Sequence, residues 1–414
     1  MKRRTLFKVL GTSALIGTFY SLWRGIRYPR LSYERYPLPD VFESDSLCLF
    51  LKDCFVSQGH RFFNNYADTN DIVFIRAFVP EPTIQINRSS KEQTLLINNI
   101  SPDATLFLKG ANSKLKKNAK EITHGITRVI RIPIIDQPIF LHWKLPRHES
   151  YEFATIGDTG GADELGWCIK RAHQLGVKFF IHLGDFSYQA SDYETAIEQF
   201  VKAPLPCYIT IGNHDFNDDG LIVDKFLADL GPLNHSFNIQ NIRFANIDTA
   251  ASFLPISGGK RADLMRALMD DKKEYDDTVA FTHRPFFDPR PEEDHDFGNV
   301  FEKKWFVKCL KIAKIDTIIA GHIHNFFDTE SEDIRILISG QGLAHEDLIH
   351  KRQVAKMLIG NITQRKKVVY RAEPLAMPFE FHCHPYVIKN WHDNDNVKPT
   401  DRVDRFCKST KENT

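Results

Sequence analysis

The chain has 414 residues, of which 42% are hydrophobic and 12% aromatic, so it can build sizeable packed cores and is not expected to be disordered. Its 54 Lys and Arg residues are balanced by 53 Asp and Glu residues, which argues against a general nucleic-acid binder. Seven widely spaced Cys residues, without a Cys-x-x-Cys pair, indicate neither a disulfide framework nor a zinc finger.

Residues 1–30 are expected to be an export signal or an N-terminal anchor. A basic head precedes the apolar residues 9–23, a segment of signal-peptide length that is short for a membrane span. The stretch Arg3-Arg4-Thr5-Leu6-Phe7-Lys8 resembles the twin-arginine pattern of bacterial proteins exported already folded, and an ordinary signal stays open. The cleavage motif Ala-x-Ala does not follow this segment. A segment that is kept, as a membrane tether through residues 9–23, is therefore at least as consistent with the sequence as one that is cleaved off.

Either form of this segment would place the rest of the chain outside the cytoplasm, in the periplasm or another extracytoplasmic space. The partner implied at this stage is the export machinery for folded proteins. The tether, if it is kept, would hold the protein at the inner membrane.

Residues 31–147 are expected to form a small β-sandwich-like domain. Short apolar runs without helical periodicity alternate there with polar, Pro- or Gly-containing breaks. The pair Cys48 and Cys54 could form a disulfide in an oxidising compartment, but two small buried side chains are the favoured interpretation. Paired carboxylates, a His cluster and a Gly-rich loop are all missing from this stretch, so it suggests no chemistry of its own.

The pattern changes at Tyr151, and residues 148–378 are expected to form an α/β domain. Apolar runs alternate with helical stretches, which is typical of a mostly parallel sheet. The expected strands are Phe153–Ile156, Val177–Leu183, Cys207–Ile211, Phe244–Asp248, Thr278–Thr282 and Thr317–Ala320. The runs Arg335–Ile338, Val354–Ile362 and Lys367–Tyr370 are expected to be closing antiparallel strands, and residues 379–414 a polar tail.

Polar side chains follow five of these strands directly. Because loops at the carboxyl ends of parallel strands share one edge of a sheet, these side chains are expected to converge. Seven of them are oxygen or nitrogen donors, which is more than one cation needs but suits two ions about 3.5–4 Å apart with a bridging carboxylate. The seven are Asp158, Asp185, Tyr188, Asn213, His283, His322 and His324.

These motifs resemble the calcineurin-like metallophosphoesterases and, among them, the purple acid phosphatases. The family signature reads here Gly157-Asp158-Thr159-Gly160, Gly184-Asp185-Phe186-Ser187-Tyr188, Gly212-Asn213-His214-Asp215, His283 and Gly321-His322-Ile323-His324. The resemblance covers about Tyr151 to Pro378. Gly160 stands where related phosphodiesterases and protein phosphatases usually carry a His, and those relatives lack a tyrosine at the place of Tyr188.

The resemblance implies a metallophosphoesterase β-sandwich flanked by helices, α+β in four-layer terms. It also implies a first ion held by Asp158, Tyr188 and His324, a second held by Asn213, His283 and His322, and Asp185 as the bridge. A phenolate ligand favours Fe(III) at the first position, while Fe(II), Zn or Mn would fill the second. His214 would be the catalytic residue that contacts the phosphoryl group and protonates the leaving alkoxide.

The implied activity is hydrolysis of a small phosphate monoester by attack of a metal-bound hydroxide. A phosphodiesterase or nucleotidase of the same superfamily is the alternative. A non-catalytic binding protein on this scaffold is less favoured, because it would be expected to lack ligands and the set is complete.

Four other features lie outside the expected set of seven donors. His382-Cys383-His384 could bind a metal, although an incidental role is favoured. Arg284 could contact phosphate or serve the turn before Pro285. Asp215 is expected to orient His214 or to support its loop, and Asp248 is expected to be structural.

Overall fold

The computed structural model describes residues 33–63, 72–110, 121–161, 163–188, 192–217, 220–291, 293–340, 356–363 and 366–375. The expected signal or anchor, the stretch His382-Cys383-His384 and the expected tail 379–414 lie outside these ranges. Among the described residues, none of the helices is long and apolar enough to cross a membrane.

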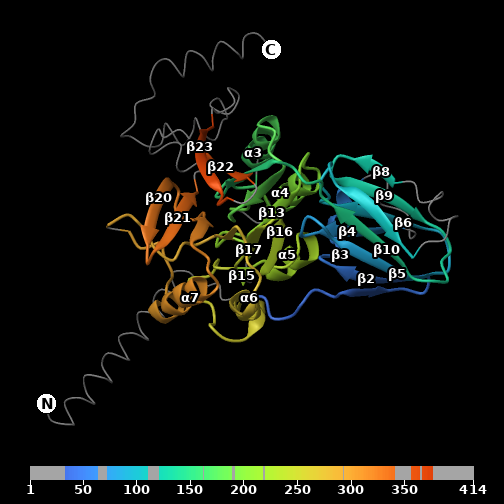
Figure 1. Cartoon of the computed structure of the whole chain (residues 1–414), viewed down its shortest axis with the longest axis horizontal. Helices are drawn as coiled ribbons and strands as arrows, with labels where there is room; N and C mark the ends of the chain where they lie inside the picture. The colour runs from blue at the N-terminus through green and yellow to red at the C-terminus, as the bar shows by residue number, and fades with distance from the viewer. Residues whose placement is uncertain are drawn as a thin grey trace, which may run out of the picture.

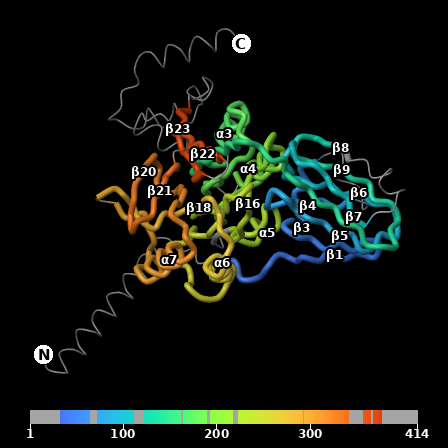
Figure 2. Tube along the Cα trace, viewed as in Figure 1, coloured from blue at the N-terminus to red at the C-terminus, as the bar shows by residue number. Residues whose placement is uncertain are grey.

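The first part of the chain folds into two five-stranded sheets, which form one end of the molecule (Figures 1 and 2). One sheet has the order β1 (Val41–Glu43), β2 (Leu47–Lys52), β5 (Thr83–Ser89), β10 (Ile139–Lys144) and β7 (Thr105–Lys109). The other has the order β3 (Cys54–Val56), β4 (Ile72–Ala77), β6 (Gln93–Asn98), β9 (Thr127–Ile132) and β8 (Glu121–His124). A 3-10 helix, η1 (Gln58–Phe62), lies between β3 and β4.

Alternating side chains explain why these strands pack as two layers. In β2, Leu47, Leu49 and Leu51 are buried while the side chains between them are not. Successive strand residues point to opposite faces, so each strand contributes one apolar face to the shared core. Cys48 and Cys54 are free thiols, and of the two only Cys54 is buried, so the expectation of two small buried side chains holds for Cys54 and not for Cys48.

The described residues of the second part of the chain form two large sheets, a two-stranded sheet and five helices. The first sheet has the order β13 (Cys207–Ile209), β12 (Phe179–His182), β11 (Ser150–Ile156), β22 (Lys356–Thr363) and β23 (Val369–Pro374). The second has the order β16 (His235–Ile239), β17 (Ile242–Asn246), β18 (Asp277–Thr282), β19 (Thr317–Ala320), β21 (Ile334–Ser339) and β20 (Phe326–Ser331). The helices are α3 (Asp163–Gln174), α4 (Asp192–Val201), α5 (Val223–Asp229), α6 (Gly259–Asp270) and α7 (Val300–Ile312), and β14 (Phe216–Asn217) pairs with β15 (Gly220–Leu221).

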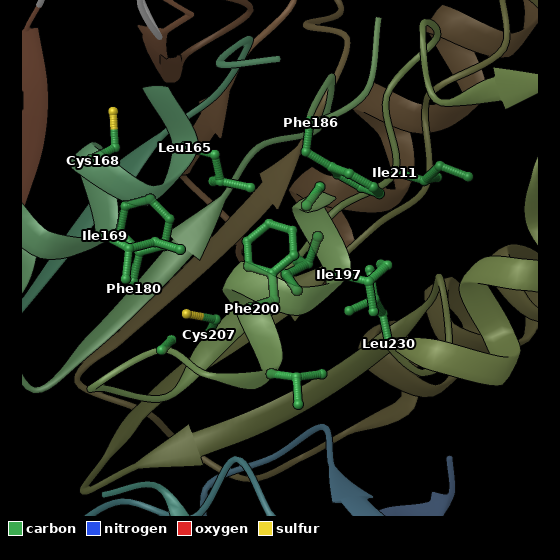
Figure 3. Close-up of a cluster of buried hydrophobic side chains, with 14 of the residues drawn as sticks. Leu165, Cys168, Ile169, Phe180, Phe186, Ile197, Phe200, Cys207, Ile211 and Leu230 are labelled. Carbon is green, nitrogen blue, oxygen red and sulfur yellow. The ribbon is translucent and has the colours of Figure 1, made fainter. Parts of the chain in front are cut away.

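The two sheets pack face to face with helices on their outer sides. Val279 and Phe281 of β18 share one apolar cluster with Phe153 of β11, whereas Ala280 belongs to the cluster under α6 and α7. On the outer side of the first sheet, Phe180 lies among side chains of α3 and α4 (Figure 3). This order of helices, sheet, sheet and helices confirms the expected α/β fold in four layers.

Two details differ from the expectation. The strand β21 is parallel to β19 and antiparallel only to β20, because the chain first forms β20 at the sheet edge and then returns beside β19. In addition, the motif-bearing strands belong to two sheets, β11–β13 to one and β18–β19 to the other. An apolar run in a sequence reveals neither the direction of its strand nor the sheet that it joins.

A buried polar junction joins the β-sandwich to the second part of the chain. The Asn99 side chain donates to the carbonyls of Ala77 and Cys207, at 2.8 and 3.1 Å, and accepts from the Cys207 N–H at 2.8 Å. Arg76 donates to the Cys207 carbonyl as well, at 3.3 Å. Since Cys207 begins β13, the junction fixes the strand that leads into the loop of Asn213 and His214.

We predict that Asn99→Ala destabilises the protein by about 2–4 kcal/mol, because buried backbone groups of Ala77 and Cys207 lose their partner. Asn99 has φ of 68°, so Asn99→Gly, which tolerates that backbone, separates strain from lost hydrogen bonds. Urea unfolding provides the measurement, with the half-buried Asn87→Ala as control. A loss of unfolding free energy in Asn99→Ala no larger than that in Asn87→Ala would contradict the role of Asn99 in fixing β13.

Candidate metal centre

Five loops meet where the strands of both sheets end. Hydrogen bonds between these loops hold them together: Gly321 N–H donates to the His283 carbonyl at 2.9 Å, and Asp158 N–H donates to the Gly184 carbonyl at 2.9 Å. The His283 ring reaches across to the Leu183 carbonyl, with 2.8 Å between Nδ1 and the oxygen. The structure therefore brings the side chains of all five sequence motifs to one place.

Three of the seven expected ligands have a left-handed backbone. Asp158, Asp185 and His322 have φ of 61°, 58° and 65°. Residues other than glycine rarely adopt this conformation, and where they do the surrounding structure must enforce it. In each case the residue lies in the turn right after a buried strand, at the point where the strand reaches the site.

Asp185 is at the centre of the arrangement. Its Oδ1 accepts the His214 N–H at 2.8 Å, and its own N–H donates to Asp215 Oδ2 at 3.1 Å. Its Oδ2 is buried, receives no hydrogen bond from any described residue, and lies 3.5 Å from His283 Nε2. A buried carboxylate oxygen without a donor is costly, and a cation would satisfy it.

The electrostatics keep Asp185 ready for a cation. Burial alone would raise the pKa of Asp185, but the imidazoles of His283 and His214 and the His214 N–H lower it below its ordinary value. The carboxylate is therefore ionised at neutral pH. The ionised Asp185 can then offer a negatively charged oxygen to a cation on either side of it.

One group of donors comprises Asp158, Tyr188 and His324. His324 Nε2 lies 3.4 Å from Asp158 Oδ1 and 3.3 Å from the Tyr188 hydroxyl. Asp158 also receives the His322 N–H on both carboxylate oxygens, at 3.1 and 2.9 Å. Burial raises the pKa of Asp158 to about 7 in the absence of a positive ion. A bound cation would favour its ionised form.

The other group comprises Asn213, His283 and His322. Because His283 Nδ1 donates to the Leu183 carbonyl, its Nε2 keeps a lone pair, and this atom faces Asn213 Oδ1 at 2.8 Å. Two acceptors in contact are an arrangement that a cation between them would relieve. Burial lowers the pKa of His283 to about 4 and that of His322 well below its ordinary value, so both rings are neutral at pH 7.

Distances divide the donors into two triads that share one residue. Ligand atoms of Asp185, His283 and His322 lie within 4.8 Å of one another, and so do those of Asp158, Asp185 and His324. Carboxylate, phenol, amide and imidazole donors suit Fe, Zn or Mn ions. The residues present therefore fit two cations with Asp185 between them.

One contact conflicts with this fit. Arg284, buried at the end of β18, places Nη1 2.6 Å from His322 Nε2. A guanidinium is always a donor, so it engages the lone pair of that nitrogen. The sequence offered two roles for Arg284, and a contact with an expected metal ligand was not one of them.

His214 lies beside the two triads and belongs to neither. Its ring is partly exposed, 4.9 Å from the ring of Tyr188 and 6.2 Å from that of Phe216 between centroids. Asp215 accepts the backbone N–H groups of Gly212, Asp185 and Ser187, at 2.6, 3.1 and 2.9 Å. Of the two roles offered for Asp215, these bonds fit support of the loop.

His295 is near the site and was not expected from the sequence. Its ring centroid lies 5.4 Å from that of His322, and its Nδ1 lies 2.9 Å from Arg290 Nη2. The only signal available was its position in the long loop after His283. Asp248 lies in the neighbouring loop after β17, where it accepts the Ala250 N–H at 3.0 Å.

A curated relative matches part of the chain. A curated Arabidopsis thaliana protein named probable purple acid phosphatase 20 is 23% identical over 197 residues. The match covers 42% of this chain and 45% of that protein, so the chain spans less than half of its relative.

Solved structures resemble the chain at a lower level. Purple acid phosphatase PPD1 from yellow lupin (Lupinus luteus) seeds is 12% identical, with 83% of this chain and 87% of that chain covered and a TM-score of 0.44. GAP50, the anchor in the inner membrane complex of Plasmodium, is 15% identical, with 55% and 85% covered and a TM-score of 0.39. Likenesses this weak carry no argument about activity.

The family comparison concerns the segment that holds the five motif-bearing loops. Residues 151–326 match the family model of calcineurin-like phosphoesterases, from the start of β11 to just past His324. The family match and both donor triads thus fall on the same stretch of chain. Residues 151–326 are a calcineurin-like phosphoesterase domain.

Proposed function

We propose that this domain binds two metal ions and hydrolyses phosphate monoesters in the manner of purple acid phosphatases. The observation that carries the proposal is the position of Asp185, which is the one residue common to both donor triads. Its buried Oδ2 receives no hydrogen bond from the described part of the chain. A carboxylate in that position is suited to bridge two cations.

The ligand groups suggest unlike ions. Tyr188 would supply a phenolate to the ion held with Asp158 and His324, which favours Fe(III), whereas Asn213, His283 and His322 would accept Fe(II), Zn or Mn. Bound ions would polarise the phosphoryl group and provide a nucleophilic water at neutral pH. The Arabidopsis relative, by its name, supports the purple acid phosphatase type over a phosphodiesterase.

His214 is suited to protonate the leaving group. Its backbone N–H is anchored to Asp185, at 2.8 Å from Oδ1, while its partly exposed ring lies next to Tyr188. The ring is thus close to where a phosphoryl group between the two triads would lie. A proton donor at this place helps most when the leaving alkoxide is a strong base.

The proposed setting is extracytoplasmic, with a small phosphorylated molecule as substrate. It rests on the N-terminal sequence alone, in which a basic twin-arginine-like head precedes the apolar residues 9–23. Export of a folded protein is consistent with a domain that receives its ions before it crosses the membrane.

We predict that Gly212→Ala abolishes metal binding in the protein that a circular dichroism spectrum shows to be folded. A Cβ at this position would collide with Oδ1 and the backbone N of Asp185, and so displace the central carboxylate. Metal content after dialysis, measured by inductively coupled plasma mass spectrometry, tests this. Gly166→Ala is the control, because its Cβ would meet the movable Gln199 side chain at 3.3 Å. Full metal content in Gly212→Ala would argue against Asp185 as a ligand.

We predict that His214→Gln lowers kcat for an alkyl phosphate about 10²–10³-fold, with unchanged metal content. The loss should be smaller for p-nitrophenyl phosphate, whose leaving group needs no proton. The same substitution at the exposed His173 is the control. Equal losses for both substrates would contradict the acid role, and a preference for bis(p-nitrophenyl) phosphate would favour the phosphodiesterase alternative.

A further inference from the structure

Arg284 is held firmly next to the second donor triad. Its backbone N–H donates to Thr249 Oγ1 at 2.8 Å, and the same hydroxyl donates to the Arg284 carbonyl at 3.0 Å. Its Nη2 donates to the Ala250 carbonyl at 3.4 Å, while Nη1 reaches His322 Nε2 at 2.6 Å. The side chain is 1% exposed. The loop after β17 therefore fixes the guanidinium against His322.

A neutral imidazole has one lone pair to offer. If Nε2 of His322 accepts from Arg284, the ring proton must be on Nδ1, and neither nitrogen is then free for a cation. We expect the His322 ring to stay beside Arg284, since the His322 N–H is hydrogen-bonded to Asp158 and the His322 backbone is held in a left-handed conformation. Arg284 also adds a positive charge beside the place where a second ion would bind.

In the first group of donors, Asp158, Tyr188 and His324, the ring of His324 contacts the other two. His324 Nε2 lies 3.4 Å from Asp158 Oδ1 and 3.3 Å from the Tyr188 hydroxyl, and His324 is partly exposed. The two halves of the site thus differ in one respect that the donor types alone do not reveal. An ion in the first group would replace contacts between its own ligands. An ion in the second group must displace the Arg284 guanidinium, which is a ligand of neither ion.

We propose that Arg284 and the second metal ion compete for His322, so that the two ions bind with unequal affinity. This proposal rests on the two-ion site of the proposed function. The first ion binds to Asp158, Tyr188, His324 and Asp185. The second binds only after the guanidinium has left His322. Arg284 thereby sets the metal occupancy of the centre.

The test is a titration of the metal-free full-length chain with Zn²⁺ in competition with a chromophoric chelator, with bound ions counted after equilibrium dialysis. The wild type should bind one ion tightly and the second more weakly. Arg284→Met should tighten the second site by at least about tenfold, because the competing donor and its charge are gone. The first site should stay within about threefold of the wild type, since no ligand of that site changes.

Arg290→Met is the matched control. Its guanidinium lies further along the same loop and bonds to Asp288 and His295, with 2.9 Å from Nη2 to either partner. This variant should leave the ratio of the two affinities unchanged. Two equally tight sites in the wild type, or no gain in Arg284→Met, would overturn the proposal.

A second measurement does not depend on the folding of any Arg284 variant. In metal-free wild-type protein labelled with ¹⁵N-histidine, long-range ¹H–¹⁵N spectra report which ring nitrogen of His322 carries the proton. The proposal requires the proton on Nδ1, and a proton on Nε2 would overturn it. Failure of the proposed function appears separately, as no hydrolysis of phosphate esters at saturating metal concentrations.

Discussion

The centre depends on one carboxylate, that of Asp185, being held in the position where both donor triads reach it. Its left-handed backbone and its N–H bond to Asp215 fix the turn, and the His214 N–H fixes one oxygen. The other oxygen stays available to both triads. Three of the five loops come from one sheet and two from the other, so this geometry exists only because the sheets pack face to face.

The β-sandwich contributes to the site through its contact with β13. Asn99 bonds to both the N–H and the carbonyl of Cys207, and Arg76 bonds to that carbonyl. Side chains of this domain such as Phe74 and Leu96 share a core with α3 and α4. A domain without chemistry of its own thus constrains the strand that ends at Asn213 and His214. This gives a physical reason for the two parts to occur in one chain.

The sequence predicted the site residues that come directly after an apolar strand. Apolar strands followed at once by Asp158, Asp185, Asn213, His283 or His322 predicted which residues would meet, because a strand end points its loop to one edge of a sheet. It did not predict the direction of β21 or the division of the motif strands between two sheets, which depend on long-range pairing. The contact of Arg284 with His322 and the approach of His295 depend on loop conformations, which periodicity does not encode.

The most direct test of the proposed iron centre is a visible absorption spectrum of the purified, metal-loaded protein beside that of Tyr188→Phe. A tyrosinate bound to Fe(III) gives a charge-transfer band that colours the protein, and the hydroxyl of Tyr188, 3.3 Å from His324 Nε2, is placed to supply it. The account predicts a coloured wild type and a colourless variant that still folds. A wild type that contains iron but shows no band, or a band that survives in Tyr188→Phe, would contradict it.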